Sequence, residues 1–119
     1  MWPFSGSGSR GESTRAAVER IDVTEARART KRGAKLVDVR SPGEFRGGHA
    51  KNARNVPPEL IKQDKVGIRR DTEVLVICLS GHRSARQARK LTNLGYSNVA
   101  NVQGGFAAWR RAGLPTKQR

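Results

Sequence analysis

The four apolar residues at 74–77 (VLVI), followed at once by the chain's single cysteine, limit the possible folds more than any other feature. A strand with apolar side chains on both faces is typical of the centre of a parallel sheet, because helices cover such a sheet on both sides. Strand patterns recur at residues 21–23, 36–39, 55–56, 74–77 and 98–102. Helix patterns lie between and after them, at residues 24–32, 59–65, 83–94 and 104–109, with a turn and short helix at residues 41–45. The sequence therefore predicts an α/β fold with three layers, α/β/α, around a five-stranded parallel sheet.

Length and composition indicate one folded domain with a basic surface. The 119 residues suffice for a single domain, which we place at residues 18–119. Residues 1–17 are rich in Gly and Ser and are predicted to form a flexible tail. The net charge of +14 favours anionic partners: small oxyanions, nucleic acid, acidic membranes or acidic proteins. Charge alone does not choose among them, and a merely solvated basic surface explains it equally well.

The sequence predicts neither a membrane anchor nor a metal site. No run approaches the roughly 18 apolar residues that a membrane span needs, and the N-terminus lacks the pattern of a secretory signal. A single cysteine cannot form an internal disulfide, so we expect a free thiol, which suits a cytoplasmic protein. His49 and His82 have no partner at metal-ligand spacing, and we expect no metal and no cofactor.

Cys78 begins a loop whose composition favours a thiolate. It directly follows the apolar strand, at the carboxyl end where open α/β sheets bind their ligands. Gly81 allows a tight curl that aims backbone N–H groups at one point, and the helix that follows adds the positive end of its dipole. Arg83 and His82 add cationic groups, which lower the pKa of a nearby thiol. The alternative is that Cys78 is a small buried apolar residue that ends a strand.

Four stretches of the chain resemble the single-domain rhodaneses, the thiosulfate sulfurtransferase family. The loop at residues 78–84 (CLSGHRS) resembles their active-site loop. Three further signatures agree in order: residues 36–45 (LVDVRSPGEF), residues 48–50 (GHA) with 55–57 (NVP), and residues 102–106 (VQGGF) followed by Trp109. Cysteine phosphatases place five residues between their cysteine and arginine, whereas four separate Cys78 from Arg83. A smaller ring suits a sulfur atom better than a phosphate.

The resemblance implies a sulfurtransferase that carries sulfane sulfur as a persulfide on Cys78. A small anionic sulfur donor such as thiosulfate would load the cysteine, and cyanide or an external thiol, small or on a protein, would accept the sulfur. The family's loop, carried onto this sequence, assigns donor and persulfide binding to the six residues after the nucleophile: Leu79, Ser80, Gly81, His82, Arg83 and Ser84. A non-catalytic module that only recognises a partner through the same pocket is the alternative.

The remaining marked residues are predicted to support the site. Asp38 and Arg40 lie at a strand end, either lining the pocket and attracting anions or forming a structural pair that fixes the loop. Glu44 and His49 are interpreted as residues that shape this connection rather than as an acid and a base. Trp109 is interpreted as a core anchor, and the pair of glycines at 104–105 as a place where backbones pack closely.

The sequence departs from the family pattern at three places. Ala50 and Asn52 replace residues that are commonly Ile and Gly, and the first helix lacks leucine. These departures predict a thinner core there.

A cluster of cations lies on or beside the helix after the cysteine loop, at Arg83, Arg86, Arg89 and Lys90, near Arg110 and Arg111. It could attract anionic donors or dock an acidic partner or tRNA. We do not expect nucleic acid to be the partner, because the six aromatic residues lie outside this cluster.

Overall fold

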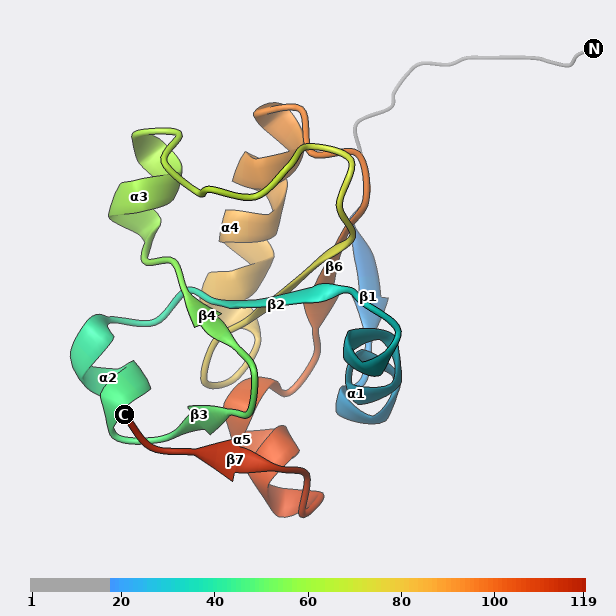
Figure 1. Ribbon diagram of the computed structural model, residues 1–119, viewed down its shortest axis with the longest axis vertical. Helices are drawn as coiled ribbons and strands as arrows, with labels where there is room; N and C mark the ends of the chain where they lie inside the picture. Colours follow the sequence, from blue (N-terminus) through green and yellow to red (C-terminus); the bar gives the residue numbers. More distant parts are fainter. Residues whose placement is uncertain (1–17) are drawn as a thin grey trace, which may run out of the picture.

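The computed structural model describes residues 18–119, which form a parallel sheet between two layers of helices (Figure 1). The sheet has five strands in the order β1-β6-β5-β2-β4, and every pairing in it is parallel. The strands are β1 (Glu19–Ile21), β2 (Lys35–Asp38), β4 (Arg54–Asn55), β5 (Val74–Ile77) and β6 (Val99–Val102). The predicted fold class is confirmed, and the four-residue apolar run is the central strand.

Helices cover both faces of the sheet because its side chains alternate between two separate apolar clusters. The helices are α1 (Val23–Lys31), α2 (Pro42–Arg46), α3 (Pro58–Lys62), α4 (His82–Asn93) and α5 (Gly105–Arg111). Leu75 and Ile77 of β5 pack in the cluster that includes α1 and α5. Val74 and Val76 face the opposite cluster, with α3 and α4. A strand buried on both sides can therefore be apolar throughout.

Trp109 of α5 is fully buried, which confirms it as a core anchor. Its indole Nε1 donates a hydrogen bond to the carbonyl of Pro115 at 2.7 Å, so the buried ring leaves no N–H unpartnered. The first helix contributes little apolar surface, since only Val23 and Ala26 are buried. Instead, Arg29 ties α1 down by ion pairs with three carboxylates, on Glu19, Glu25 and Glu73.

A second, two-stranded sheet was not predicted from the sequence. β3 (His49–Ala50) pairs antiparallel with β7 (Thr116–Lys117), which returns the C-terminal segment to the middle of the chain. Two residues per strand carry no periodic signal, so only the tertiary structure reveals this pairing. It places the C-terminal segment beside the connection that leaves α2.

Several predicted boundaries were wrong by a few residues. The first strand ends at Ile21 rather than continuing to Val23, because the Asp22 carboxylate accepts the N–H of Glu25 at 2.8 Å and begins α1. β4 covers residues 54–55 rather than 55–56, and α3 ends at Lys62 rather than Lys65.

The predicted tail at residues 1–17 lies outside the described residues. Within residues 18–119, no helix has the length and apolar character needed to cross a lipid bilayer.

Candidate active site

Cys78 lies at the carboxyl end of β5, where the central strand meets the loop that begins α4. Its side chain is buried, with 0% of its surface exposed, and packs with Val76 and Val39 in one apolar cluster. The strand order places β2 and β6 on either side of β5, so the loops after all three strands meet around the thiol. Residues far apart in the sequence therefore surround a single sulfur atom.

The loop curls so that backbone groups point back at the sulfur. Gly81 has φ +104°, a left-handed conformation that glycine adopts readily and that side chains disfavour. Its N–H donates a hydrogen bond to Cys78 Sγ at 3.0 Å. α4 begins at the next residue, so the positive end of the helix dipole also faces this region. The predicted curl is thus present, with a backbone N–H directed at the sulfur.

The environment of Cys78 favours its charged form. Burial raises the pKa of the Cys78 thiol, but hydrogen bonds from the Ser84 hydroxyl and from the backbone N–H groups of Ser84, Gly81 and Ser80 together lower it by more. The resulting pKa lies below that of an ordinary cysteine thiol. A lower pKa increases the fraction of the thiol that is present as thiolate, the nucleophilic form, at a given pH.

Asn101 holds the loop from the neighbouring strand, and sequence reasoning missed it. Its Nδ2 donates to the carbonyl of Gly81 at 3.2 Å, and its Oδ1 accepts the hydroxyl of Ser84. The hydroxyl has one proton, so Asn101 and the Cys78 sulfur compete for it. An asparagine inside the otherwise apolar strand β6 was the available signal, because a buried amide needs partners.

The Arg83 guanidinium forms an ion pair with the Glu44 carboxylate. Arg83 Nη1 donates to Glu44 Oε1 at 3.0 Å and Nη2 donates to Oε2 at 3.1 Å, which joins α4 to α2. The Ser41 hydroxyl and N–H also donate to Glu44, whose carboxylate completes the capping box of α2. The predicted structural role of Glu44 agrees with these contacts, but its direct bond to the loop arginine was not predicted.

Asp38 and Arg40 form a buried pair at the end of β2. The Asp38 carboxylate accepts hydrogen bonds from Nε and Nη2 of Arg40, the second at 2.8 Å, and also from the Arg40 backbone N–H. Nη2 of Arg40 also donates to the carbonyl of Gly48, and the guanidinium lies over the Phe106 ring, 4.8 Å from its centroid. Of the two interpretations left open, these contacts favour the structural pair.

The two histidines have different environments. His82 is exposed at the start of α4, and its Nδ1 lies 3.1 Å from the hydroxyl of Ser80. His49 is buried, stacks on the ring of Phe45 and donates from Nδ1 to the Phe45 carbonyl at 2.7 Å. His49 therefore ties down the connection after α2, as the sequence suggested. Among residues 18–119, no three His, Cys, Asp or Glu side chains are grouped to hold a metal ion.

The start of α5 packs directly against the Cys78 loop. Phe106 N–H donates to the carbonyl of Cys78 at 2.7 Å, and Ala107 N–H donates to the carbonyl of Leu79 at 3.0 Å. Gly105 has φ +58°, and a Cβ atom there would lie 2.6 Å from the backbone carbon of Leu79. The predicted close packing at the paired glycines is confirmed. It holds the Cys78 loop against the start of α5.

The chain is similar to known proteins over most of its length. The family model of the rhodanese-like domain matches residues 22–112. The thiosulfate sulfurtransferase GlpE of Vibrio cholerae is 42% identical over 96 residues, which cover 80% of this chain and 91% of that protein. The uncharacterized protein YqhL of Bacillus subtilis is 45% identical over 78 residues, 66% of this chain, and the chain spans only 62% of its length. A rhodanese-related protein from Thermoplasma volcanium has the same fold in its crystal structure, with a TM-score of 0.77 and 30% identity over 85% of this chain and 99% of that one.

Proposed function

The chain belongs to the family of rhodanese-like domains, and on that premise we propose that it is a sulfurtransferase that carries sulfane sulfur from thiosulfate to cyanide or a thiol through a persulfide on Cys78. One observation carries the proposal: a buried thiol with a lowered pKa receives the N–H of Gly81 at 3.0 Å. The name of the GlpE relative supports thiosulfate as the donor.

The first half-reaction loads the cysteine. The Cys78 thiolate attacks the outer sulfur of thiosulfate, the sulfur–sulfur bond of the donor breaks, and sulfite leaves with the electron pair. The negative charge then lies on the outer sulfur of the Cys78 persulfide. We propose that the N–H groups from Leu79 to Arg83 stabilise it, together with the hydroxyl of Ser84, as preorganised donors stabilise other anions in a buried site.

The second half-reaction transfers the outer sulfur from Cys78 to an acceptor. Cyanide, or the thiolate of an acceptor, attacks the outer sulfur and takes it as thiocyanate or as a new persulfide, which restores the Cys78 thiolate. The chain has no second cysteine, so an internal disulfide cannot discharge the persulfide. The acceptor must therefore come from another molecule.

Arg83 is the cation that we assign to the anionic donor. Its guanidinium lies in the field of the Cys78 thiolate. This charge is among the causes that raise the pKa of Arg83, after the dominant hydrogen bond that Arg83 donates to Glu44. In the free protein the Arg83 guanidinium is paired with the Glu44 carboxylate, so a dianionic donor has to compete with this carboxylate. We expect the competition to weaken donor binding without preventing it, because the ion pair is partly exposed.

Intact-mass spectrometry tests the proposal directly. Incubation with thiosulfate should add the mass of one sulfur atom, and subsequent cyanide should remove it. The Cys78→Ser variant, which keeps a small polar side chain, should gain nothing. A wild-type protein that is folded by circular dichroism yet gains no sulfur would favour a non-catalytic module that only recognises a partner.

A further inference from the structure

Leu79, the residue after the nucleophile, has an apolar side chain that is exposed to solvent. It is 40% exposed and is the only large apolar residue of the described range 18–119 that is exposed to this degree. Its backbone is fixed, because its carbonyl accepts the N–H of Ala107 at 3.0 Å. Interfaces commonly centre on such an apolar contact surrounded by a polar rim. Leu79 therefore presents an exposed apolar side chain one residue from the sulfur carrier.

The part of the chain that carries the site has charges of one sign only. From Val74 to the C-terminus the sequence has eight Lys and Arg and no Asp or Glu. All eight cations are exposed, and among residues 18–119 only Arg83 of the eight has an ion-pair partner. The other seven have no ion pair within residues 18–119, so this part of the surface attracts anions.

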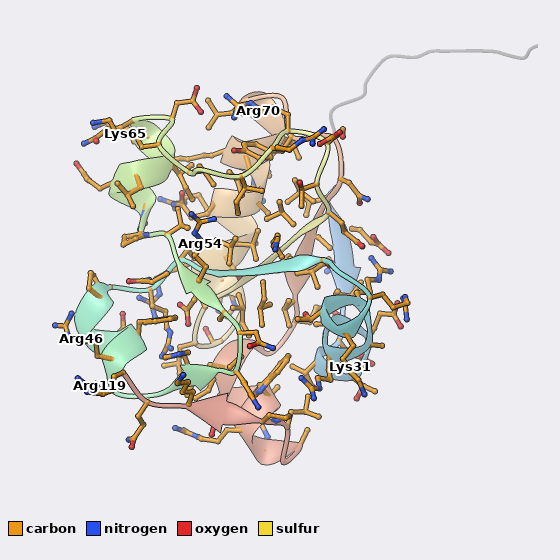
Figure 2. The ribbon with its side chains drawn as sticks, viewed as in Figure 1. Lys31, Arg46, Arg54, Lys65, Arg70 and Arg119 are labelled. Atoms are coloured by element: carbon orange, nitrogen blue, oxygen red, sulfur yellow. The ribbon has the colours of Figure 1, made fainter. Side chains whose placement is uncertain are left out.

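Cations from α2, α4, α5 and the C-terminus lie on this side of the molecule. Glu44 joins Arg83 to α2, and Arg46 follows two residues later. The carbonyl of Arg46 accepts the N–H of Arg119, so the C-terminus lies on the same corner; Figure 2 shows Arg46 and Arg119 together there, away from Lys65 and Lys31. We call the set Arg46, Arg83, Arg86, Arg110 and Arg119 the basic rim.

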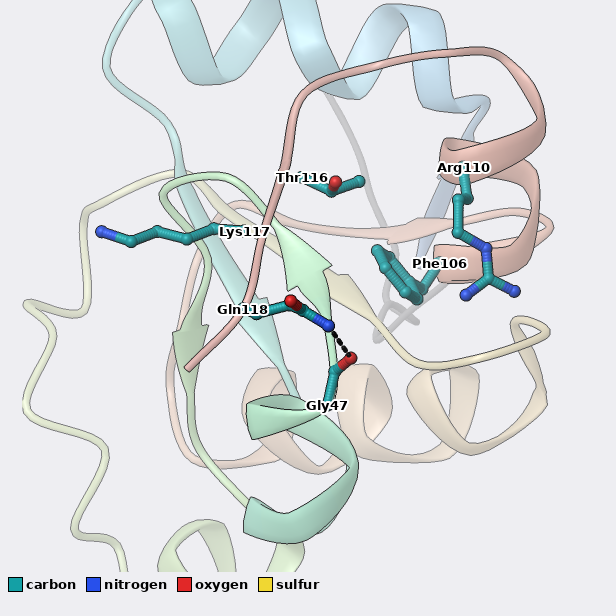
Figure 3. A pocket seen from close by; sticks show the side chains of 7 residues that line it. Gly47, Phe106, Arg110, Thr116, Lys117 and Gln118 are labelled. Carbon is teal, nitrogen blue, oxygen red and sulfur yellow. Dashed lines mark hydrogen bonds between the residues drawn. The ribbon is translucent and has the colours of Figure 1, made fainter.

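A hollow of about 310 Å³ opens beside Arg110 of the basic rim. It lies between α5, the turn after α2 and the C-terminal strand β7, and Figure 3 shows Arg110 beside the Phe106 ring on its wall. The Arg110 guanidinium lies 5.1 Å from the centroid of that ring. Phe106, which lines the hollow, also donates its backbone N–H to the Cys78 carbonyl, so this residue connects the hollow to the Cys78 loop. An acidic side chain bound in the hollow would lie beside Arg110 and Lys117.

We propose that Leu79 and the basic rim form a docking surface for an acidic protein segment whose thiol accepts the persulfide sulfur. The inference rests on the proposed function for its chemical step: the partner's thiolate attacks the outer sulfur, the bond between the two persulfide sulfurs breaks, and the electron pair returns to Cys78 as a thiolate. Carboxylates of the partner pair with the basic rim, and an apolar residue beside its cysteine covers Leu79.

The surface fits an acidic protein better than RNA. Proteins that bind single-stranded nucleic acid commonly stack bases on exposed aromatic rings. Tyr96, Phe106 and Trp109 are buried, and Phe45 is half-buried and already stacks on His49. Among residues 18–119, Leu79 and the basic rim therefore offer cations and one leucine but no exposed Phe, Tyr or Trp ring.

Peptide binding tests the surface without any sulfur chemistry. The probe is a fluorescent peptide with leucine next to serine at its centre and glutamates on both sides, and its control has glutamine in place of each glutamate. At about 0.02 M salt we expect the acidic probe to bind at least about tenfold tighter, with the difference shrinking at about 0.5 M salt. Anisotropy titrations give both dissociation constants. Equal affinity for the two peptides would overturn the proposal.

Two charge-matched double variants locate the binding. Arg46→Gln with Arg86→Gln removes two charges from the basic rim, whereas Lys62→Gln with Lys65→Gln removes two exposed charges at α3. We expect the first pair to weaken binding of the acidic probe about fivefold or more and the second to change it less than about twofold. Equal losses, or tighter binding of an oligouridylate than of the acidic probe, would contradict the proposal.

Sulfur transfer then connects the surface to the reaction. With cysteine in place of the serine, the acidic peptide should discharge preformed persulfide faster than its glutamine control, and the Arg46/Arg86 double variant should lose this advantage. Its rate with cyanide should match wild type, because cyanide needs no docking. If wild type forms no persulfide the proposed function fails, but the binding titrations still decide whether the docking surface exists.

Discussion

Glu44 on α2 and Arg83 on α4 form a two-pronged ion pair beside the Cys78 loop, with N···O distances of 3.0 and 3.1 Å. The Arg83 guanidinium is the main reason that the pKa of the Glu44 carboxyl falls to about 2, although burial acts against it. Glu44 is therefore ionised throughout the pH range of any enzyme assay. Protonation does not release Arg83 under those conditions; only substitution or a competing anion does.

Glu44→Gln should lower the KM for thiosulfate, because the guanidinium is then free to bind the donor. The effect should fade at high salt, where screening weakens the attraction between Arg83 and the anion. Steady-state kinetics of thiocyanate formation measures it, with Glu59→Gln on exposed α3 as the charge-matched control. An unchanged or higher KM in a stably folded Glu44→Gln protein would show that Glu44 acts only by holding α2 and α4 together.

Persulfide formation should rise with pH and then level off, with a midpoint below the pKa of an ordinary thiol. The reason is that the reactive form is the thiolate, which dominates above the lowered pKa of Cys78. Ser84→Ala removes one hydrogen-bond donor to the sulfur, so its midpoint should shift to higher pH. Stopped-flow measurement of the first half-reaction across pH gives both midpoints. An identical midpoint in Ser84→Ala would mean that the hydroxyl donates only to Asn101.

Asn101→Ala should destabilise the protein by about 1–3 kcal/mol, because the Gly81 carbonyl and the Ser84 hydroxyl lose a buried partner. Urea unfolding of Asn101→Ala, Ser84→Ala and the double variant forms a cycle. We expect the two losses to be less than additive, since the two side chains share one hydrogen bond. Additive losses would exclude a direct interaction. Asn93→Ala, at the exposed end of α4, serves as the control.

Gly105→Ala should disrupt both stability and activity, whereas Gly113→Ala should affect only stability, and less. Both glycines have positive φ, +58° and +71°, so both substitutions introduce backbone strain of about 1 kcal/mol or somewhat more. Only at Gly105 would the new Cβ also press on the backbone of Leu79. Thermal unfolding and persulfide yield measure the two effects. Equal behaviour of the two variants would contradict this account of the close packing.

Asp38→Ala should cost about 3–5 kcal/mol of folding stability, because it leaves the Arg40 guanidinium buried without its counter-ion. Asp71→Ala breaks an exposed ion pair with Arg69 and should cost no more than about 1 kcal/mol. Chemical denaturation of the two variants measures the difference. A small loss for Asp38→Ala would mean that Gly48 and the Phe106 ring suffice to hold Arg40.

Long apolar patterns made most of the fold predictable. β5 is apolar on both faces, and strands alternate with helices on either side of it in the sequence. Together these patterns identify the parallel sheet, because such a strand is stable only between two layers of helices. Short elements were not predictable in the same way. β3 and β7 have two residues each, and their pairing depends on where α5 turns the chain back. Similarly, Asp22 caps α1, so that the helix begins one residue before the predicted range 24–32. Its start depends on where β1 ends its pairing with β6.

By itself, the sequence determined the nucleophile and its loop: one cysteine after a buried strand, a glycine that can adopt positive φ, and an arginine at the start of a helix. These features are local, so neighbouring residues suffice to specify them. Only the tertiary structure decided what holds and occupies that loop. Asn101 reaches Gly81 from β6, Glu44 takes Arg83 from α2, and Gly105 admits the loop backbone. These partners lie 20 or more residues away along the chain, and only the packing of the strands and helices brings them to the sulfur.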